Sequence, residues 1–212
     1  MALAMADVRE LFATRIYQAS LAEAPGFAAF NGELEQACRM LAEEDLAGQA
    51  WCRKQGYSGY TSYASLTDLP TRATIFDQLK RRLDRHAASF AKTLALDLGP
   101  RGRLTLDSLW VNILKPGGVH TGHIHPHSVL SGTYYVAMPP GSSGLRLEDP
   151  RLAMMMAAPP RRADAPEALR SFVTLTPTVG SLILWESWLR HEAPANRGKS
   201  PRISISFNYA WR

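Results

Sequence analysis

Four of the six histidines of the chain lie within the stretch from His120 to His127. In an extended segment, residues two positions apart point to the same side and lie about 6–7 Å apart. The side chains of His123 and His125 can therefore reach one metal ion together, and imidazole nitrogen is a common ligand of transition metals. A second stretch that includes His191 follows 66 positions after His125. The pattern indicates a metal site, around which the rest of the chain is organised.

The end of the histidine stretch leaves the full ligand set open. Pro126 removes a backbone donor and keeps His125 extended, which favours a strand edge or the mouth of a barrel. His127 lies about 13 Å from His123 if the segment stays extended, so one ion can hardly take all three. Glu148 and Asp149 are the nearest carboxylates downstream and are alternative ligands. A solvated histidine-rich loop is the alternative without a function.

Composition excludes several classes of protein. The chain has 212 residues, of which 46% are hydrophobic and 20% charged, as expected for a single globular domain over residues 1–212. The net charge of +5 is spread over the chain without a basic stripe, so we expect no nucleic-acid partner. Cys38 and Cys52 form no redox or zinc motif. No apolar run is long enough to span a membrane, and no signal peptide is evident, so a cytoplasmic protein is expected.

The elements that must position the histidines divide the chain into two parts. Residues 8–18 resemble an opening strand or an extended arm, 33–46 an amphipathic helix, 51–70 a loop that is long enough to be a lid, and 71–98 a long helix. After residue 103 the pattern changes to strands at 104–114, 131–138, 172–176, 181–185 and 202–209, with an irregular excursion at 151–170 that we expect over one face of the sheet. This order predicts an α+β fold, in which residues 1–102 supply helical support and a lid, and residues 103–212 form a sandwich or barrel.

The last of these strands has a strict alternation. Arg202, Ser204, Ser206 and Asn208 fall on one face, and the apolar residues between them fall on the other. A guanidinium can bind a carboxylate with two parallel hydrogen bonds, and a hydroxyl on the same face can donate to the same anion. Arg202 and Ser204 are therefore candidates for binding an acidic small molecule.

Residues 104–211 resemble the 2-oxoglutarate/Fe(II)-dependent dioxygenase superfamily. The usual motif of that family is His-x-Asp/Glu, then a distal His, then Arg or Lys about ten residues further along. Here the corresponding residues are His123-Ile124-His125-Pro126, His191, and Arg202-Ile203-Ser204. The chain is similar to the prolyl hydroxylase branch and especially to the aspartyl/asparaginyl β-hydroxylase branch, whose members also lack the carboxylate. Its motifs also resemble those of bacterial and phage members with the pattern His-x-His-Pro-x-Ser and Ser-Gly-x-Tyr-Tyr-Val.

The resemblance implies a double-stranded β-helix, a jelly-roll barrel related to the cupins, backed by the N-terminal helices. It implies Fe(II) held by His123, His125 and His191, with 2-oxoglutarate bound by Arg202 and Ser204. The reaction would convert 2-oxoglutarate and O₂ to succinate and CO₂ while a substrate is hydroxylated. One of the consecutive residues Tyr134 and Tyr135 must face inward, and we assign Tyr134 to the cosubstrate.

Two other functions remain open. Three histidines also suit zinc or the iron of cupin-type dioxygenases, so a cupin-like binding module without turnover and a zinc-dependent hydrolase are alternatives. A hydrolase would need a general base such as Glu148 or Glu186. The substrate is expected to be a small molecule or a peptide, with walls formed by residues 51–70 and the methionines at 154–156. Methionine-rich loops and exposed aromatic residues are compatible with a homodimer.

Overall fold

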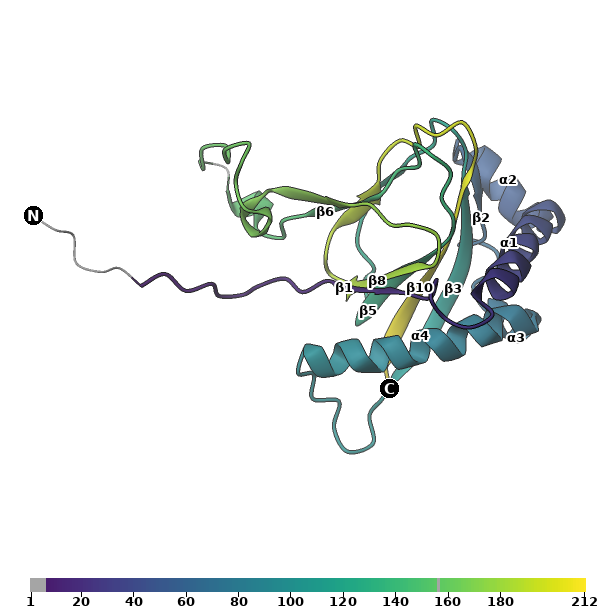
Figure 1. Ribbon diagram of the computed structural model, residues 1–212, viewed down its shortest axis with the longest axis horizontal. Coiled ribbons are helices and arrows are strands. Elements are labelled where there is room, and N and C mark those ends of the chain that lie inside the picture. Colours follow the sequence, from purple (N-terminus) through teal and green to yellow (C-terminus); the bar gives the residue numbers. More distant parts are fainter. Residues whose placement is uncertain (1–6, 156) are drawn as a thin grey trace, which may run out of the picture.

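Two antiparallel sheets form the body of the protein in the computed structural model, which describes residues 7–155 and 157–212 (Figure 1). One sheet has six strands in the order β1-β8-β5-β10-β3-β2, and the other has four in the order β4-β9-β6-β7. The strands are β1 (Tyr17–Ser20), β2 (Gly59–Thr61), β3 (Leu104–Leu114), β4 (His120–His123), β5 (Leu130–Ala137), β6 (Leu145–Glu148), β7 (Phe172–Leu175), β8 (Ser181–Glu186), β9 (His191–Ala193) and β10 (Arg202–Trp211). This is the double-stranded β-helix that the resemblance implied.

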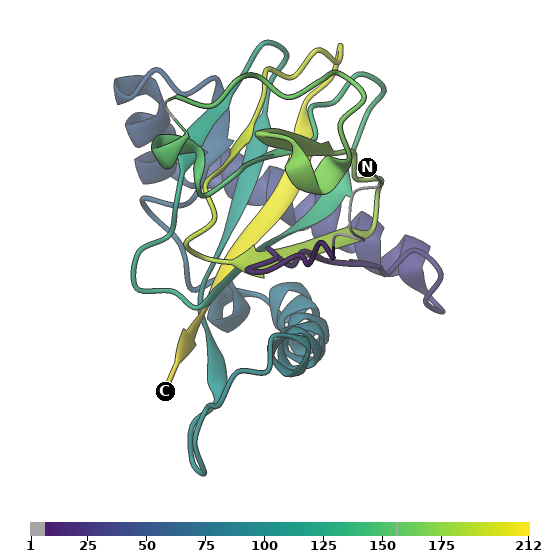
Figure 2. The same ribbon diagram turned by 90° about the vertical axis from the view of Figure 1, so that its left-hand side faces the viewer.

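The α-helices of the described residues lie on the outer face of the six-stranded sheet (Figures 1 and 2). They are α1 (Phe27–Glu44), α2 (Leu46–Lys54), α3 (Leu69–Arg72) and α4 (Thr74–Thr93), and two short 3₁₀ helices, η1 (Leu152–Met154) and η2 (Glu167–Leu169), lie in the β6–β7 connection. The apolar stripe of α4, with Leu79, Leu83 and Phe90, packs in one core with Val111 of β3 and Ile205 of β10. Burying such a stripe is what stabilises a helix against a sheet.

A second, smaller core lies between the two sheets. It contains Tyr135, Ile183 and Trp185 of the large sheet together with Leu145 and Leu147 of β6. Strand β5 therefore contributes to both cores, because its alternate side chains point to opposite faces. The inner side of the large sheet faces the four-stranded sheet, and the site lies between them.

Strand β10 follows the predicted alternation. Ile203, Ile205 and Phe207 belong to the helix-side core, while Arg202 and Ser204 line the cleft between the sheets. The strand is held from both sides, by β3 and by β5, and is central in Figure 2. A central strand has a fixed register, so the residues on its inner face are held in place.

Several predicted boundaries were wrong. Residues 51–70 are not one loop, because α2 continues to Lys54 and β2 pairs with β3. The long helix begins at Thr74, since Ala73 is extended, and α3 precedes it. The segment 8–18 was expected to be a strand or an extended arm. Its strand part begins only at Tyr17, and the described residues before it form an extended arm with no ladder partner among the described residues. Residues 151–170 project beyond the sheets instead of covering a face (Figure 1), and Met156 lies outside the described residues.

In the part of the chain that the structure describes, no helix combines the length and the apolar character that a membrane span requires.

Candidate metal and cosubstrate site

The three histidines meet where β4 and β9 run side by side. His123 and His191 are direct cross-strand partners, and their ring centroids lie 4.4 Å apart. His125 follows the end of β4, and its ring lies 4.9 Å from that of His123 and 5.2 Å from that of His191. One nitrogen of each ring lies within 4.8 Å of the other two. Three imidazole nitrogens that converge in this way can share one metal ion.

Two of the three rings are fixed by the main chain. Nδ1 of His123 is 2.8 Å from the carbonyl oxygen of Thr121, and Nδ1 of His191 is 2.8 Å from that of Leu189. A carbonyl oxygen only accepts, so both Nδ1 atoms must carry the proton and donate. Nε2 of each ring is then unprotonated and free to bind a metal, which is how metal-binding histidines are usually oriented.

Burial keeps these rings neutral. It lowers the pKa of His125 to about 4 and that of His191 to about 3, and the neighbouring His123 adds to both shifts. Burial also lowers the pKa of His123, against the hydrogen bond to Thr121, which raises it. Only a neutral imidazole can bind a metal, so burial keeps the three rings in the required charge state at neutral pH.

The alternative ligands are not part of this group. His127 is exposed and has a φ of +70°. Oε2 of Glu148 accepts a hydrogen bond of 3.0 Å from Nε of Arg190, and Asp149 forms a salt bridge of 2.9 Å with Arg151. Among residues 7–155 and 157–212, the three histidines form the one group of three or more potential ligands that is close enough to hold an ion.

Arg202 lies in the same cleft as the histidines. Its side chain lines an open cleft together with Ser204 and the three histidines. The residue is only 5% exposed, and no carboxylate of a described residue lies within 4.0 Å of its guanidinium. A buried charge without a partner is costly. The cleft therefore favours an anion beside Arg202.

Polar side chains on neighbouring strands line the cleft between Arg202 and the histidines. Oγ of Ser206 lies 3.1 Å from Oγ1 of Thr133 and accepts a hydrogen bond of 3.1 Å from Nδ2 of Asn112. The register explains their proximity, because Ser206 of β10 lies opposite Thr133 of β5, and Asn112 of β3 lies opposite Ser204, the next residue of β10 on the same face. This wall can hydrogen-bond a polar small molecule.

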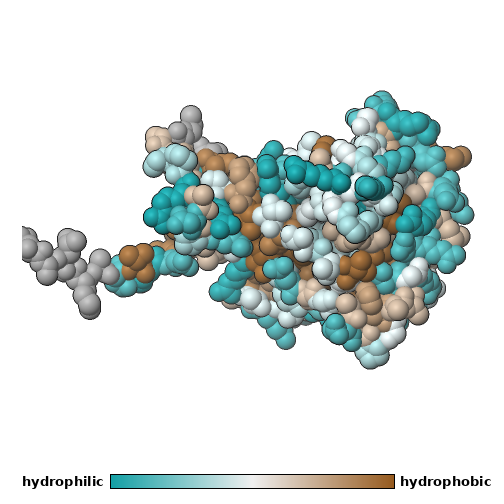
Figure 3. All heavy atoms as spheres, turned by 45° about the horizontal axis from the view of Figure 1, so that its top comes forward, coloured by the Kyte–Doolittle hydropathy of each residue, from teal (hydrophilic) through white to brown (hydrophobic). Residues whose placement is uncertain are grey.

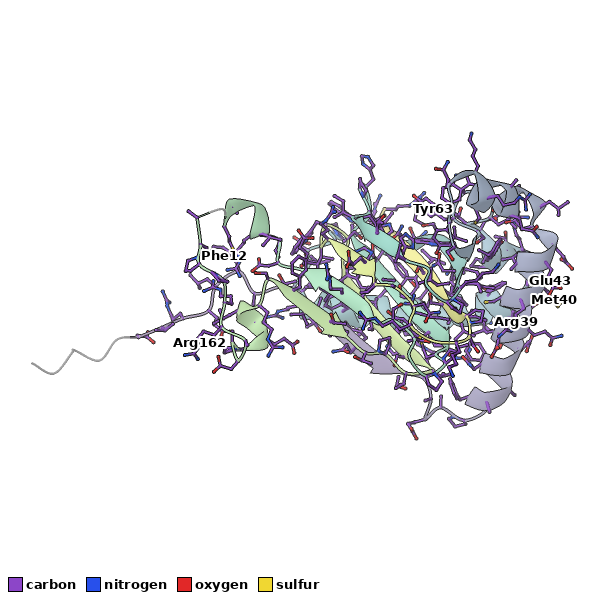
Figure 4. The ribbon with its side chains drawn as sticks, turned by 90° about the horizontal axis from the view of Figure 1, so that it is seen from above. Phe12, Arg39, Met40, Glu43, Tyr63 and Arg162 are labelled. Atoms are coloured by element: carbon purple, nitrogen blue, oxygen red, sulfur yellow. The ribbon has the colours of Figure 1, made fainter. Side chains whose placement is uncertain are left out.

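Aromatic residues surround the histidines on the other side. The ring of Trp185 lies 4.5 Å from that of His191, and the ring of Trp110 lies 5.7 Å from that of His125. Tyr63 packs edge-on against Trp110 with ring centroids 5.2 Å apart and is exposed at the surface (Figure 4). The buried Trp185 therefore forms part of the wall of the site, and Trp110 and Tyr63 form an aromatic rim beside it.

Tyr134 does not lie in this cleft. Its hydroxyl donates a hydrogen bond of 2.8 Å to Oδ1 of Asn31 of α1, in the helix-side core. The assignment of Tyr134 to the cosubstrate is therefore corrected: the neighbouring Tyr135 faces between the sheets, and its ring centroid lies 5.1 Å from Cζ of Arg202. Side chains alternate along a strand, so the sequence shows that one of the two tyrosines faces the cleft but not which one. The answer depends on the side of the sheet on which the helices pack.

Two further residues of the cleft were not anticipated. His120 stacks on His123 with ring centroids 4.6 Å apart, and Tyr57 lies edge-on to His120 at 5.9 Å. Three positions separate His120 from His123, which would place them on opposite faces of a regular strand, but a register irregularity in β4 brings them to the same side. Tyr57 lies in the segment after α2, and no sequence motif around it indicates that it belongs to a site.

A double-stranded β-helix with converging imidazoles and a buried arginine in one cleft is characteristic of non-haem metal enzymes. The model of a family described as "Putative 2OG-Fe(II) oxygenase" matches residues 108–208, the region that holds the histidines, Arg202 and Ser204. The part of the chain that carries the histidines and the arginine therefore matches a family of 2-oxoglutarate/Fe(II)-dependent oxygenases, enzymes that use Fe(II) and 2-oxoglutarate.

Solved structures share the fold. A prolyl-4-hydroxylase from Pseudomonas putida is 19% identical, with 93% of this chain and 92% of that chain covered and a TM-score of 0.60. The epimerase SnoN, solved in complex with Fe³⁺, alpha ketoglutarate and nogalamycin RO, is 16% identical over 93% of this chain and 79% of that chain, with a TM-score of 0.63. A viral collagen prolyl hydroxylase from Paramecium Bursaria Chlorella virus-1 is 12% identical over 92% and 96%, with a TM-score of 0.55. No curated protein sequence matches the chain.

Proposed function

We propose that this oxygenase holds Fe(II) with His123, His125 and His191, and binds the distal carboxylate of 2-oxoglutarate with Arg202 and Ser204. The observation that carries the proposal is the placement of a buried arginine, unpaired among the described residues, in the same cleft as three converging imidazole nitrogens. A dicarboxylic 2-oxoacid has one end that can chelate a metal and another that suits a guanidinium. The two halves of the cleft fit these two ends.

The residues that line the site have different roles in this proposal. The guanidinium of Arg202 neutralises the distal carboxylate, and the hydroxyl of Ser204, two residues along the same strand face, donates to it. The carbonyl oxygens of Thr121 and Leu189 hold the rings of His123 and His191 with Nε2 toward the ion. Fe(II), when bound, supplies the activation of O₂ that couples decarboxylation of 2-oxoglutarate to oxidation of the substrate.

Trp185 and Trp110 exclude water and narrow the access to the histidines. Excluding water protects a reactive centre and strengthens the electrostatic contacts within it. We infer that the substrate enters at the aromatic rim that includes Tyr63, opposite the polar wall of Ser206 and Thr133. A small molecule or a peptide side chain fits this opening; prolyl hydroxylases and an epimerase with a small-molecule ligand share the fold.

The zinc-hydrolase alternative is less well supported by the structure. Of the two candidate general bases, Glu148 is paired with Arg190, and Glu186 does not line the cleft that contains the histidines. A general base must be within reach of the water that it activates and free to take its proton. A cupin-like module that only binds a metal does not require an unpaired arginine beside the metal site.

The proposal is tested by turnover of the iron-loaded protein. We expect conversion of 2-oxoglutarate to succinate and CO₂ only with Fe(II) and O₂, at a low rate without substrate and faster with it. His191→Ala should abolish this conversion, while His127→Ala should leave it unchanged because His127 is exposed and outside the ligand group. Hydrolytic activity with Zn(II) in the absence of O₂ would contradict the proposal.

We further propose that residues 1–212 act as a single cytoplasmic domain that forms a homodimer. The support is the extended N-terminal arm, which carries the exposed apolar residues Val8, Leu11 and Phe12, with Phe12 96% exposed. Figure 3 shows hydrophobic atoms, in brown, on this arm, and Figure 4 shows Phe12 at the projecting end of the molecule. Sedimentation velocity should give a dimer that dissociates in Phe12→Ser; a monomeric wild type would rule this out.

A further inference from the structure

His125 differs from the other two histidines in what its Nδ1 atom faces. The Nδ1 atoms of His123 and His191 face main-chain carbonyl oxygens, which fix the proton on Nδ1. Nδ1 of His125 lies instead 3.4 Å from Nδ2 of Asn208, the side-chain amide nitrogen of a buried residue on β10. An amide nitrogen only donates, so in this arrangement Nδ1 of His125 accepts and the ring proton is on Nε2.

That arrangement is incompatible with a metal ion on Nε2 of His125. The ion needs an unprotonated nitrogen, and because Nδ1 is occupied by Asn208, Nε2 is the atom left for the metal. Metal binding therefore requires the ring proton to leave Nε2 for water and a proton from water to be taken up at Nδ1. No net proton is gained or lost at His125. A protonated Nδ1 must then face an acceptor.

Asn208 can become that acceptor without moving its backbone. The oxygen and nitrogen of an amide occupy nearly the same space, so a half-turn of the side-chain amide exchanges donor and acceptor. Oδ1 now accepts from Oγ of Ser131 at 2.8 Å, and Oγ of Ser131 lies 2.8 Å from Oγ of Ser187. Nδ2 of Asn208 also donates to Oγ of Ser108 at 3.3 Å. Hydroxyl groups both donate and accept, so the three serines can reverse their hydrogen bonds when the amide turns.

The same residues also hold the backbone of His125. The amide of His125 donates to the carbonyl oxygen of Ser187 at 3.1 Å. The backbone of His125, Ser187, Ser131, Asn208 and the ring of His125 thus form a closed ring of contacts. Ser131, Ser187 and Asn208 are all buried, so water does not readily replace any member when another is removed.

We propose that Asn208 is a positioning residue for the third metal ligand, and that its side-chain amide reverses when His125 binds the ion. This inference rests on the proposed function, because it takes His125 as a ligand. The sequence places Asn208 on the same strand face as Arg202, so one strand, β10, positions both the cosubstrate carboxylate and the ligand that stands where most of the superfamily has a carboxylate.

The wild-type protein tests the reversal directly. Long-range ¹H–¹⁵N correlation spectra distinguish the two tautomers of each imidazole, and Zn(II) serves as a diamagnetic probe ion. We expect His123 and His191 to carry the proton on Nδ1 with and without Zn(II), whereas the proton of His125 moves from Nε2 to Nδ1 when Zn(II) is added. A His125 proton on Nδ1 in both states would overturn the reversal.

Variants test the positioning role through metal affinity, measured by competition with a chromogenic chelator. Asn208→Ala should weaken Zn(II) binding about 10- to 100-fold, as removal of an outer partner of a ligand typically does. Asn208→Asp should restore it to within about threefold of the wild type, because an ionised carboxylate only accepts and favours a proton on Nδ1. Asn31→Ala is the matched control: it removes a buried amide that binds Tyr134 and the carbonyl of Val136 on the helix side of the sheet, and it should leave the affinity unchanged.

The outcomes separate this inference from the proposed function. If His191→Ala abolishes Zn(II) binding while Asn208→Ala binds like Asn31→Ala, the metal site stands and the role of Asn208 is overturned. An Asn208→Asp variant that binds as weakly as Asn208→Ala also overturns it. If His191→Ala and His123→Ala both bind Zn(II) as the wild type does, the proposed metal site itself is wrong.

Discussion

At the scale of single residues, the side chains of the cleft are held by fixed partners before any ligand binds. Two of the three imidazoles donate to main-chain carbonyls, and burial keeps their pKa values below the ordinary range. The composition of the group could be predicted from the spacing of His123 and His125 and from the motif that includes His191. The orientation of each ring could not, since it depends on carbonyl and amide groups that no sequence pattern indicates.

Restoring the carboxylate at position 125 is the first prediction. His125→Asp converts three histidines into the two-histidine, one-carboxylate set that suits Fe(II), so we expect Fe(II) affinity within about tenfold of the wild type. His125→Ala removes a ligand and should weaken binding by at least about 100-fold. Anaerobic competition with a chelator measures both. Equal affinities of the Ala variant and the wild type would mean that His125 does not bind the ion.

Loss of the guanidinium is the second prediction. Arg202→Ala should raise the dissociation constant for 2-oxoglutarate by at least about 30-fold, because removing one partner of a buried charge pair costs about 2–5 kcal/mol. Fe(II) binding should not change, since Arg202 is not a ligand. Calorimetric titration under anaerobic conditions gives both constants. An unchanged constant for 2-oxoglutarate in Arg202→Ala would place the distal carboxylate elsewhere in the cleft.

At the scale of elements, the strongly patterned segments were predictable and the weakly patterned ones were not. The repeat of apolar residues in α4 and the strict alternation in β10 each predicted the element and its buried face. The helix α2 was missed because its residues show no clear repeat of apolar positions. The sequence feature that marks its start is Asp45, whose side chain caps the first turn by accepting a hydrogen bond of 2.9 Å from the amide of Gly48. The pairing of β2 with β3, which brings the segment containing Tyr57 to the cleft, depends on tertiary contacts alone.

Glycines on two different elements give a paired stability prediction. A Cβ at Gly132 of β5 would lie 2.4 Å from the ring of Phe207, whereas one at Gly32 of α1 would meet nothing within 4 Å. Gly132→Ala should therefore lower the free energy of unfolding by about 1–3 kcal/mol through overpacking. Gly32→Ala should raise it by about 0.5–1 kcal/mol, because alanine favours the helix. Urea denaturation of the two variants should move in opposite directions; a shift of the same sign would contradict the packing described here.

The cap of α2 gives a pH-dependent prediction. Burial raises the pKa of Asp45, but hydrogen bonds from Ser65, Gly48 and Tyr60 outweigh it and lower the pKa below its usual 3.8. A lowered folded-state pKa stabilises the fold fully above the unfolded pKa, and that stabilisation is lost as the pH falls through the folded pKa. Asp45→Asn should cost about 1–3 kcal/mol at pH 7, and the difference from the wild type should shrink at pH 3. A difference that is the same at both pH values would show that the charge is not involved.

At the scale of the whole molecule, the cleft exists because two sheets close over one another. Arg202 comes from the large sheet, while His123 and His191 come from the small one. The order of helices and strands predicted the class of fold, but it did not predict which faces of the two sheets pack against each other. It depends on the small core of Tyr135, Trp185 and their neighbours, which involves residues far apart in the chain.

A ligand that contacts both sheets should stabilise the whole fold. At 100 times its dissociation constant, 2-oxoglutarate added to the Fe(II) protein without O₂ should contribute about 2.7 kcal/mol, which corresponds to a rise in Tm of about 5–10 °C for a chain of this size. Differential scanning calorimetry measures the shift. Succinate, which has the distal carboxylate but no keto group, should give a smaller shift; an equal one would mean that the metal end of the site does not contribute.

The central claim is that one cleft binds iron through the three histidines and 2-oxoglutarate through Arg202 at the same time. The measurement that tests it most directly is an anaerobic titration of the Fe(II) protein with 2-oxoglutarate, followed by the visible charge-transfer absorption of the iron chelate. We expect the band to appear in the wild type, to require much more 2-oxoglutarate in Arg202→Ala, and to be absent in His191→Ala. A wild-type protein that demonstrably holds Fe(II) but develops no band would contradict the account.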